Sequence, residues 1–319
     1  MSGKPDLAAL FGAPEVDTFF GLARAEPGDG GASAALIGVP GATPYAGVGA
    51  YCAGAPAALR RASGALAANM DRHNFDIGGP VFPEGSLPAV DCGDLRFDPA
   101  DFAANRKVIA EAVRKVLATG AVPVVVGGDD SVPIPMLAAL ETTGRPVWIL
   151  QIDAHIDWRR AHIGEDMGLS STMRRASEMA HVAGIVQVGA RGIGSAHPDD
   201  VADALDWGAR IVTAEALHTD GMAQVLEAIP EGADIALCLD VDAFDPALVP
   251  GVIGRAPGGL SYGQGLALIR GAAARGRIVA ADVVEYVPEA DVDGIGALTV
   301  TRAMAALLGV LSRQGLRAR

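Results

Sequence analysis

The chain has 319 residues, half of them hydrophobic, and a formal net charge of −13. This acidity argues against nucleic acid and against an anionic membrane surface as partners. The three cysteines (Cys52, Cys92 and Cys238) are scattered without a CxxC pair, which argues against a disulfide framework or a zinc ribbon.

The N-terminal stretch, "MSGKPDLAALFGAP", lacks a basic region followed by a long apolar run. We therefore expect no signal peptide and a cytoplasmic protein. No internal repeat or low-complexity linker divides the rest of the chain. We interpret residues 1–30 as a loosely held arm and residues 31–319 as a single domain.

Short runs rich in Val, Ile and Leu recur along the chain and predict strands. Because these runs do not alternate with polar residues, both faces of each strand should be buried. Segments 101–120 and 261–276 suit helices, so strands and helices alternate and predict a mostly parallel sheet in a three-layer α/β domain. The apolar stretch 297–313 is interrupted by Arg302 and predicts a buried helix rather than a membrane span. The clearest strand runs are 34–40, 122–128, 147–153, 184–191, 209–217, 235–242 and 277–287.

Three of these strands run directly into acidic clusters. They are "GGDDS" (127–131), "DAHID" (153–157) and "DVDAFDP" (240–246). In an open parallel sheet, ligands bind outside the carboxyl ends of the strands. We therefore expect the three clusters to meet in one crevice.

The spacing within these clusters favours metal binding. In "DAHID" the acidic and histidine side chains occupy alternate positions, so an extended segment directs all three the same way. Taken alone, a DxD pair more often caps a helix or lies in a loop. Together, however, five carboxylates in one pocket cannot all stay ionised without cations. Two divalent metal ions would balance them, and oxygen-rich ligation suits Mn²⁺, with Ni²⁺ as the alternative. The predicted ligands are Asp130, Asp153, His155, Asp157, Asp240 and Asp242.

This set of motifs resembles the ureohydrolase family of arginases, agmatinases and guanidinobutyrases, and its agmatinase-like members in particular. The resemblance extends from about residue 34 to the C-terminus. Besides the acidic clusters it rests on "GVPGATPY" (38–45), "GAPAALR" (54–60), "VDCGD" (90–94), "PGGLSY" (257–262) and "DVVEYVP" (282–288). It implies an α/β/α fold with an eight-stranded sheet, a binuclear manganese centre, and a homotrimer or homohexamer.

The resemblance also assigns roles to individual residues. Asp153 and Asp240 would bridge the two metals, and Asp157 would complete the shell of one. His155 and Asp242 would complete the shell of the other. Glu285 would pair with the guanidinium of a small guanidino substrate, since a carboxylate can bind that planar cation through two hydrogen bonds.

The reaction implied is hydrolysis of the guanidino group to urea and an amine. A divalent metal lowers the pKa of bound water to about 7, so that hydroxide can attack the guanidinium carbon near neutral pH. Asp242 would manage the proton of this hydroxide. Asp242 and Glu285 are thus the candidate catalytic residues.

The sequence departs from the family pattern at two places. Asp130 stands where the family carries a histidine ligand, which shifts one metal toward an all-oxygen shell. After "DAHID" the family has a histidine near the substrate, whereas Leu169 or Ser170 stands there in this chain. We assign both residues to the substrate-binding wall. His162 lies upstream and could substitute, although a solvated loop position is the simpler expectation.

Three hypotheses stay open. The chain could be an amidinohydrolase for agmatine or a related compound. It could be a catalytically weak or silent subunit that assembles with an active homologue, showing activity only with that partner. It could also be a protein that binds guanidinium compounds without releasing urea. The retained bridging aspartates and Glu285 favour the enzyme, and the missing motif for the amino-acid end of arginine disfavours arginine as substrate.

Overall fold

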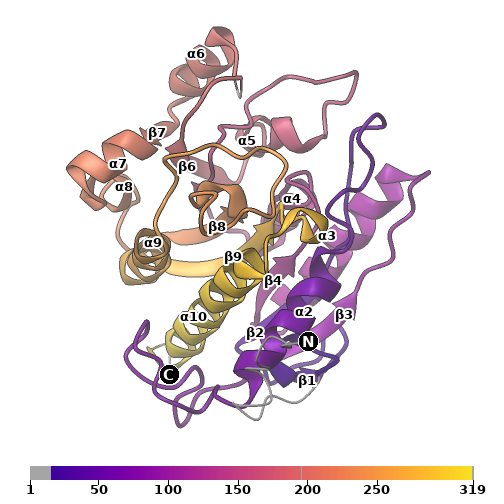
Figure 1. Ribbon diagram of the computed structural model, residues 1–319, viewed down its shortest axis with the longest axis vertical. Helices are drawn as coiled ribbons and strands as arrows, with labels where there is room; N and C mark the ends of the chain where they lie inside the picture. Colours follow the sequence, from indigo (N-terminus) through magenta and orange to yellow (C-terminus); the bar gives the residue numbers. More distant parts are fainter. Residues whose placement is uncertain (1–15, 195, 318–319) are drawn as a thin grey trace, which may run out of the picture.

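The computed structural model of the chain describes residues 16–194 and 196–317. Within these ranges nine strands form one sheet, in the order β1-β3-β2-β4-β9-β8-β5-β6-β7, and every neighbouring pair is parallel (Figure 1). The strands are β1 (Ala23–Arg24), β2 (Ala34–Gly38), β3 (Ala89–Asp94), β4 (Val122–Val126), β5 (Val147–Ile152), β6 (Val182–Ala190), β7 (Arg210–Thr213), β8 (Asp234–Asp240) and β9 (Arg277–Val284).

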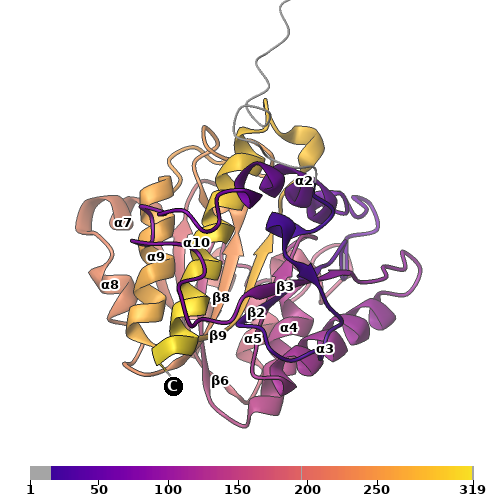
Figure 2. The ribbon, with the colours of Figure 1, turned by 90° about the horizontal axis from the view of Figure 1, so that it is seen from below.

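Helices cover both faces of the sheet, which confirms the expected α/β/α layers (Figure 2). One face packs against α2, α8, α9 and α10, and the other against α3, α4, α5 and α6. Parallel strands buried on both faces need this double cover. The described helices are α2 (Ala55–Ala67), α3 (Phe102–Ala118), α4 (Pro133–Ala139), α5 (Thr172–Ser177), α6 (Pro198–Trp207), α7 (Ala214–Asp220), α8 (Ala223–Leu226), α9 (Tyr262–Arg275) and α10 (Ile295–Arg317).

The order of the central strands places the acidic clusters together. Strands β4, β9, β8 and β5 are consecutive neighbours in the sheet. In register, Val126 lies beside Val283, Leu239 lies beside both Val283 and Ile152, and all four strands end at the same edge. The segments that follow β4, β5 and β8 therefore emerge side by side, and Glu285 follows β9 between them.

Part of the arm expected over residues 1–30 contacts the rest of the chain. Residues 1–15 lie outside the described ranges. The backbone N–H of Phe19 donates to Asp91 at 2.8 Å, and the Arg60 guanidinium lies 4.3 Å from the centre of the Phe19 ring. Strand β1 then pairs with β3 at the sheet edge, which makes nine strands instead of the expected eight. The division into arm and domain remains a prediction.

One predicted strand is shorter in the structure, and one predicted buried helix is confirmed. The run 209–217 is not one strand, because Thr213 accepts a hydrogen bond from the N–H of Ala216 at 3.1 Å and caps α7. Helix α10 is long and apolar enough to cross a membrane by length and composition. However, 83 % of its most apolar window is buried inside the protein, which confirms the expected buried helix.

Candidate metal centre

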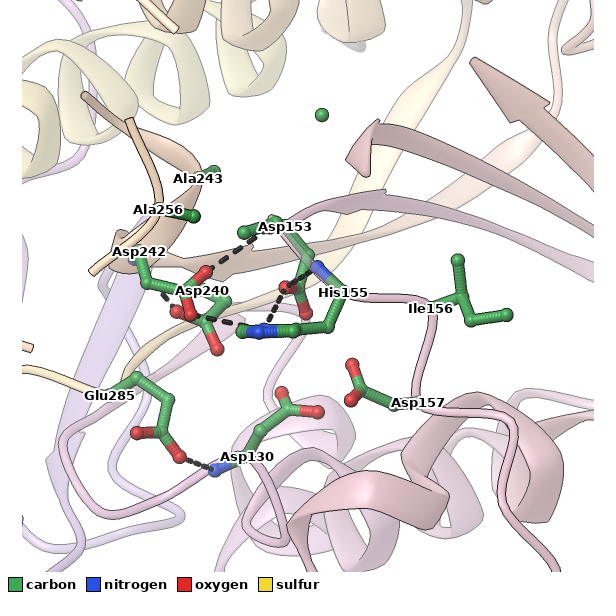
Figure 3. Close-up of polar contacts among 12 residues, drawn as sticks. Asp130, Asp153, His155, Ile156, Asp157, Asp240, Asp242, Ala243, Ala256 and Glu285 are labelled. Atoms are coloured by element: carbon green, nitrogen blue, oxygen red, sulfur yellow. Dashed lines mark hydrogen bonds and ion pairs between the residues drawn. The ribbon is translucent and has the colours of Figure 1, made fainter. Parts of the chain in front are cut away.

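The segment after β5 brings its acidic and histidine side chains together. Asp153 Oδ1 accepts a hydrogen bond from the N–H of His155 at 2.6 Å and lies 3.3 Å from His155 Nδ1. The same Nδ1 lies 3.1 Å from Asp242 Oδ2, so the imidazole connects the clusters that follow β5 and β8 (Figure 3). Because Asp153 and Asp242 are buried, these contacts are shielded from water.

Asp157 reaches the site by a different route from the simple alternation expected. Its backbone has φ +45°, in the left-handed region, so the segment is not extended throughout. Gln151 Nε2 lies 2.7 Å from Asp157 Oδ2 and 2.7 Å from Asp153 Oδ2, and so holds the two carboxylates together. The convergence was expected, but the buried amide that produces it was not.

Two groups of potential ligands overlap at one residue. Asp130, Asp153 and Asp157 offer carboxylate oxygens that lie within 4.8 Å of one another. A second group, within the same limit, consists of Asp153, His155 and Asp242. Asp153 belongs to both groups, as the bridging role implied by the resemblance requires. A site of two adjacent cations sharing one carboxylate fits this arrangement.

Asp240 lies in the same pocket but outside both groups (Figure 3). Its Oδ1 accepts a hydrogen bond from the N–H of Asp242 at 2.8 Å, which forms the short turn after β8. Burial and then the charges of Asp242 and Asp153 raise the pKa of Asp240 well above its usual range. Asp240 is therefore close to the other carboxylates, while its bridging role stays a prediction.

Burial and mutual repulsion dominate the electrostatics of the cluster. Burial first, and then neighbouring carboxylates, raise the pKa values of Asp130, Asp153 and Asp157. Burial opposes protonation of His155, but its hydrogen bonds to Asp153 and Asp242 outweigh burial and raise its pKa to about 12. In the described part of the chain, the ion pairs to these carboxylates come from His155 alone. The chain thus supplies the His155 imidazole and, less directly, the Arg191 guanidinium for a cluster of several anions.

The donor set fits divalent cations. Asp130 is only 3 % exposed, and its Oδ2 is buried and makes no hydrogen bond to any residue that the structure describes. A buried carboxylate oxygen without a partner is costly, and such an atom calls for a missing ligand. Carboxylate oxygens with one imidazole suit Mn²⁺ and comparable divalent ions. The replacement of a histidine by Asp130 therefore preserves a potential ligand.

The adjacent residue Asp129 has a structural position. It accepts hydrogen bonds from the N–H of Ser131 at 2.9 Å and from the Ser131 hydroxyl. Gly127 and Gly128 before it have φ +97° and +74°, and an added Cβ would lie 2.6 Å from Pro56 and Val132, respectively. This turn explains the two adjacent aspartates, since Asp129 fixes the loop while Asp130 enters the cluster.

Glu285 lies opposite Asp130 and is held in a strained conformation (Figure 3). Its backbone φ is +68°, which is uncommon for a residue with a side chain, and its N–H donates to the carbonyl oxygen of Gly128 at 2.9 Å. Glu285 Oε1 accepts from the N–H of Asp130 at 2.9 Å. Burial and then the charge of Asp129 raise the pKa of Glu285 to about 8.

Tyr51 is a site residue that sequence reasoning missed. Its hydroxyl lies 2.7 and 2.8 Å from the two carboxylate oxygens of Glu285 and donates to them. Tyr51 belongs to the loop between β2 and α2, far from Glu285 along the chain. Nothing local in the sequence marks it, because the contact depends on the position of that loop over the carboxyl edge.

Two further positioning side chains were also missed. Gln187 Nε2 donates to Gln151 Oε1, which orients the amide that holds Asp153 and Asp157. A glutamine inside each of two apolar strands, β5 and β6, was a visible signal. Arg191 donates to the carbonyl oxygens of Asp242 at 2.7 Å and Ala256 at 2.9 Å and thereby fixes the loop beside the cluster.

Leu169 and Ser170 lie in a short 3₁₀ turn, η3 (Leu169–Ser171), and both are half-buried. The N–H of Ser170 donates to the Tyr45 hydroxyl at 3.2 Å. His162 is half-buried rather than fully solvated, and its ring packs edge-on against Tyr45 with centres 5.1 Å apart. These residues form a wall next to the segment that carries Asp157, while their contact with a substrate remains a prediction.

Together the fold and the site define an α/β/α protein with a carboxylate-rich centre at the carboxyl edge of a parallel sheet. The arginase family model matches residues 32–309, and the chain belongs to the arginase family. This family implies a divalent metal centre. The motif resemblance described above is therefore confirmed.

Individual relatives are about a third identical to this chain over the residues that align. The mitochondrial agmatinase of Gallus gallus is 31 % identical over 246 residues, which cover 75 % of this chain and 71 % of the relative. A guanidinopropionase of Pseudomonas aeruginosa is 34 % identical over 244 residues, or 74 % of this chain and 76 % of the relative. Both are ureohydrolase-type enzymes by name.

A solved structure supports the fold over nearly the whole chain. The proclavaminate amidinohydrolase of Streptomyces clavuligerus superposes with a TM-score of 0.82 at 28 % identity, over 94 % of this chain and 98 % of that one. The chain is thus an amidinohydrolase that acts on guanidino compounds. The silent-subunit alternative is not favoured.

Proposed function

We propose that this protein is a divalent-metal-dependent amidinohydrolase that releases urea from a small guanidino compound. The overlap of two ligand groups at Asp153, with Glu285 across the same pocket, is the observation that carries the proposal. One group holds carboxylates only and the other adds the imidazole of His155. Cations bound there would supply neutralising charge and lower the pKa of a coordinated water, the chemistry that hydrolysis at neutral pH requires.

The chain's own residues orient the substrate and handle the proton. Glu285 presents both carboxylate oxygens on a rigid support formed by Tyr51 and the N–H of Asp130. A guanidinium can donate two parallel hydrogen bonds to this carboxylate, and its charge would favour the ionised form of Glu285. Burial of Glu285 excludes water from that contact.

Asp242 is placed to take and hold a proton from the attacking water. Burial raises the pKa of Asp242, but the hydrogen bond from His155 outweighs burial and keeps that pKa below its usual range. Its Oδ2 is 3.1 Å from His155 Nδ1, and the hydrogen bond from this imidazole orients the carboxylate toward the site. Collapse of the tetrahedral intermediate would then return the proton to the leaving amine.

The substrate belongs to a range that the names of the relatives illustrate, from agmatine to guanidino acids. Agmatine was the expectation from the family as a whole. Leu169 and Ser170 are proposed to line the pocket for the substrate tail. By analogy with the family we further propose a cytoplasmic homotrimer or homohexamer, and a hetero-oligomer with an active homologue is its less favoured form.

The deciding experiment measures metal content and urea release together. Protein reconstituted with Mn²⁺ or Ni²⁺ should hold about two equivalents per chain, as expected for two ligand groups, and should release urea from a guanidino compound. Asp130→His is the matched variant, because it should move the metal preference toward Ni²⁺, which imidazole ligation suits. Fewer than two equivalents in both forms, with no urea, would contradict the proposal.

A further inference from the structure

Arg159 lies in the segment that carries Asp157, and its guanidinium has an unused donor. It follows Asp157 by two residues. Its Nη1 lies 3.0 Å from His162 Nδ1, and its Nη2 donates to the carbonyl oxygen of Gly194 at 3.0 Å. Its Nε is buried and has no hydrogen-bond partner within residues 16–194 and 196–317. An unsatisfied buried donor on a cationic group indicates a missing acceptor.

The lack of a carboxylate partner distinguishes Arg159 from nearby arginines. Arg160 pairs with Asp203 at 2.9 Å, Arg174 pairs with the same Asp203 at 2.7 Å, and Arg175 pairs with Glu178 at 3.0 Å. Among the described residues, no carboxylate forms an ion pair with Arg159. The chain has 38 acidic residues against 25 lysines and arginines, so anionic partners are plentiful elsewhere. An anion from outside the chain would complete this site.

Tyr45 relates Arg159 to the metal centre. The Tyr45 hydroxyl accepts from the N–H of Ser170, and the N–H of Arg159 donates to the carbonyl oxygen of Ser170 at 3.0 Å. Burial raises the pKa of Tyr45, and among the charges that act on its hydroxyl are Asp157, which raises it, and Arg159, which lowers it. The hydroxyl of Tyr45 is thus close to a predicted metal ligand and to the unpaired guanidinium.

His162 holds one side of the guanidinium, and on the other side Nε and one hydrogen of Nη2 have no acceptor among the described residues. Partial burial and then the charge of Arg159 lower the pKa of His162, so the ring is neutral at pH 7 and Nδ1 can accept from Nη1. Nη2 carries a second hydrogen beside Nε–H. This edge of an arginine matches the two oxygens of a carboxylate.

We infer that Arg159 binds the carboxylate of a guanidino acid whose guanidinium is held by Glu285. The inference rests on the proposed function and specifies its substrate class as ω-guanidino acids rather than agmatine. Glu285 and Arg159 would then bind opposite charges at opposite ends of the substrate. Agmatine would place an ammonium group against the Arg159 guanidinium, and like charges in a partly buried site repel each other.

The test compares three substrates that share a four-carbon chain and differ in its end. They are 5-guanidinopentanoate (carboxylate), 1-butylguanidine (methyl) and agmatine (ammonium), with 4-guanidinobutanoate as the shorter acid. We expect kcat/KM to be highest for an acid and lowest for agmatine. Arg159→Ala should lower kcat/KM for the acid by about 10- to 100-fold, which is the effect of losing a charged hydrogen-bond pair. For butylguanidine, kcat/KM should stay within about threefold of the wild-type value.

Arg160→Ala is the matched control, because Arg160 is 74 % exposed in its side chain and has its own partner. This substitution should leave kcat/KM unchanged for all three substrates. Arg159→Glu should raise the rate with agmatine relative to the acid. Equal losses on all three substrates in Arg159→Ala, or a wild-type preference for agmatine, would overturn the inference while leaving the proposed function intact.

A binding measurement separates this failure from failure of the proposed function. In thermal unfolding, 5-guanidinopentanoate should stabilise the wild type and Arg160→Ala but not Arg159→Ala. If no substrate is hydrolysed by metal-loaded protein, the proposed function fails. A stabilisation that depends on Arg159 would then still support a carboxylate site, and stabilisation independent of Arg159 would overturn it.

Discussion

Strand β8 begins and ends with an aspartate, and the two residues are equally buried. Asp234 and Asp240 are each 3 % exposed. Asp234 accepts from Arg145 Nε at 2.6 Å and from Arg277 Nε and Nη2 at 3.1 Å. Burial opposes ionisation of Asp234, but these arginines outweigh burial and lower its pKa. Asp240 forms no ion pair with a described residue, and burial and then neighbouring carboxylates raise its pKa.

The difference shows that direct ion pairs with arginine, not the solvent exposure of the aspartate itself, separate the two ends of the sheet. At the amino edge the chain neutralises its buried carboxylate with its own arginines. At the carboxyl edge it collects several carboxylates with His155 as their ion-pair partner. Such a cluster is costly unless ions from solution complete it. The carboxyl edge is therefore built for a ligand, whereas the amino edge is complete in itself.

Cavity size would have selected the wrong end. A cavity of about 770 Å³ opens at the amino edge, and Ser33, Val122 and Arg277 are among the residues that line it. None of the described residues around it is acidic or a histidine. The acidic centre lies at the opposite edge of the same strands. Converging polar groups are thus the better guide to the chemistry of this protein.

Replacing the shared ligand should have the largest effect. Asp153→Asn removes one charge from both ligand groups at once. We expect a loss of about 10³-fold or more in kcat and loss of bound metal, since the residue supports the electrostatics of the whole centre. Urea release and elemental analysis check this prediction. Retention of two metals with near-normal activity would show that Asp153 is not shared.

Removal of the bound metal ions should have the second-largest effect, a loss of stability. A ligand at 100 times its dissociation constant stabilises the folded state by about 2.7 kcal/mol per site. Treatment with a chelator should therefore lower the midpoint of thermal unfolding by several degrees, and Mn²⁺ should restore it. Differential scanning calorimetry measures the shift. In Asp153→Asn the same treatment should change little, and an equal shift in both proteins would assign the effect to metal bound elsewhere.

A substitution at Gln151 tests how much the residues that position the ligands contribute to metal affinity. Gln151→Met keeps the volume but removes the donor that reaches Asp153 and Asp157. We expect metal affinity to fall by about 10- to 100-fold, the usual effect of losing such a supporting contact. Competition with a chelating dye gives the affinity, and circular dichroism at saturating metal controls for the fold. Unchanged affinity would mean that the two carboxylates are positioned by their backbone alone.

The sequence predicted the sheet and the convergence of its acidic clusters because both depend on local signals. Apolar runs mark buried parallel strands, and the residues after them lie at one edge whatever the strand order. Strands β1 and β3 are absent from the predicted runs. A two-residue edge strand such as β1 leaves no pattern, and the sequence of β3, "AVDCGD", is too polar to form an apolar run. The strand expected over 209–217 was shortened by a capping threonine, whose effect depends on the turn around it.

The parts of the site that could not be predicted depend on contacts between distant segments. Tyr51 reaches Glu285 from a loop 234 positions away in sequence. The unpaired state of Arg159 is visible only when every nearby carboxylate has been placed. The role of Gln151 was easier to predict, because a glutamine in an apolar strand indicates a buried polar contact. Sequence patterns thus locate the ligands, while tertiary structure determines what orients them.

The smallest effect is expected at the amino edge, where Asp234→Asn should leave metal content and activity unchanged. Hydrogen bonds to a charged group contribute about 1.5–3 kcal/mol, but Arg145 and Arg277 are about 60 % exposed, so we expect a loss of about 1 kcal/mol. Because the folded-state pKa of Asp234 is lowered, this stability is present above the unfolded pKa near 3.9 and is lost as the pH falls through the lower folded value.

Urea unfolding at pH 7 and near pH 3 measures this contribution. The difference in unfolding free energy between wild type and Asp234→Asn should be present at pH 7 and shrink toward zero in acid. Asp240→Asn makes the matched comparison at the other end of β8. In chelated protein this variant should be no less stable than the wild type, since it removes one of several repelling carboxylates. If Asp240→Asn destabilised the chelated protein more than Asp234→Asn does, the two ends of the strand would not differ in the way their charges indicate.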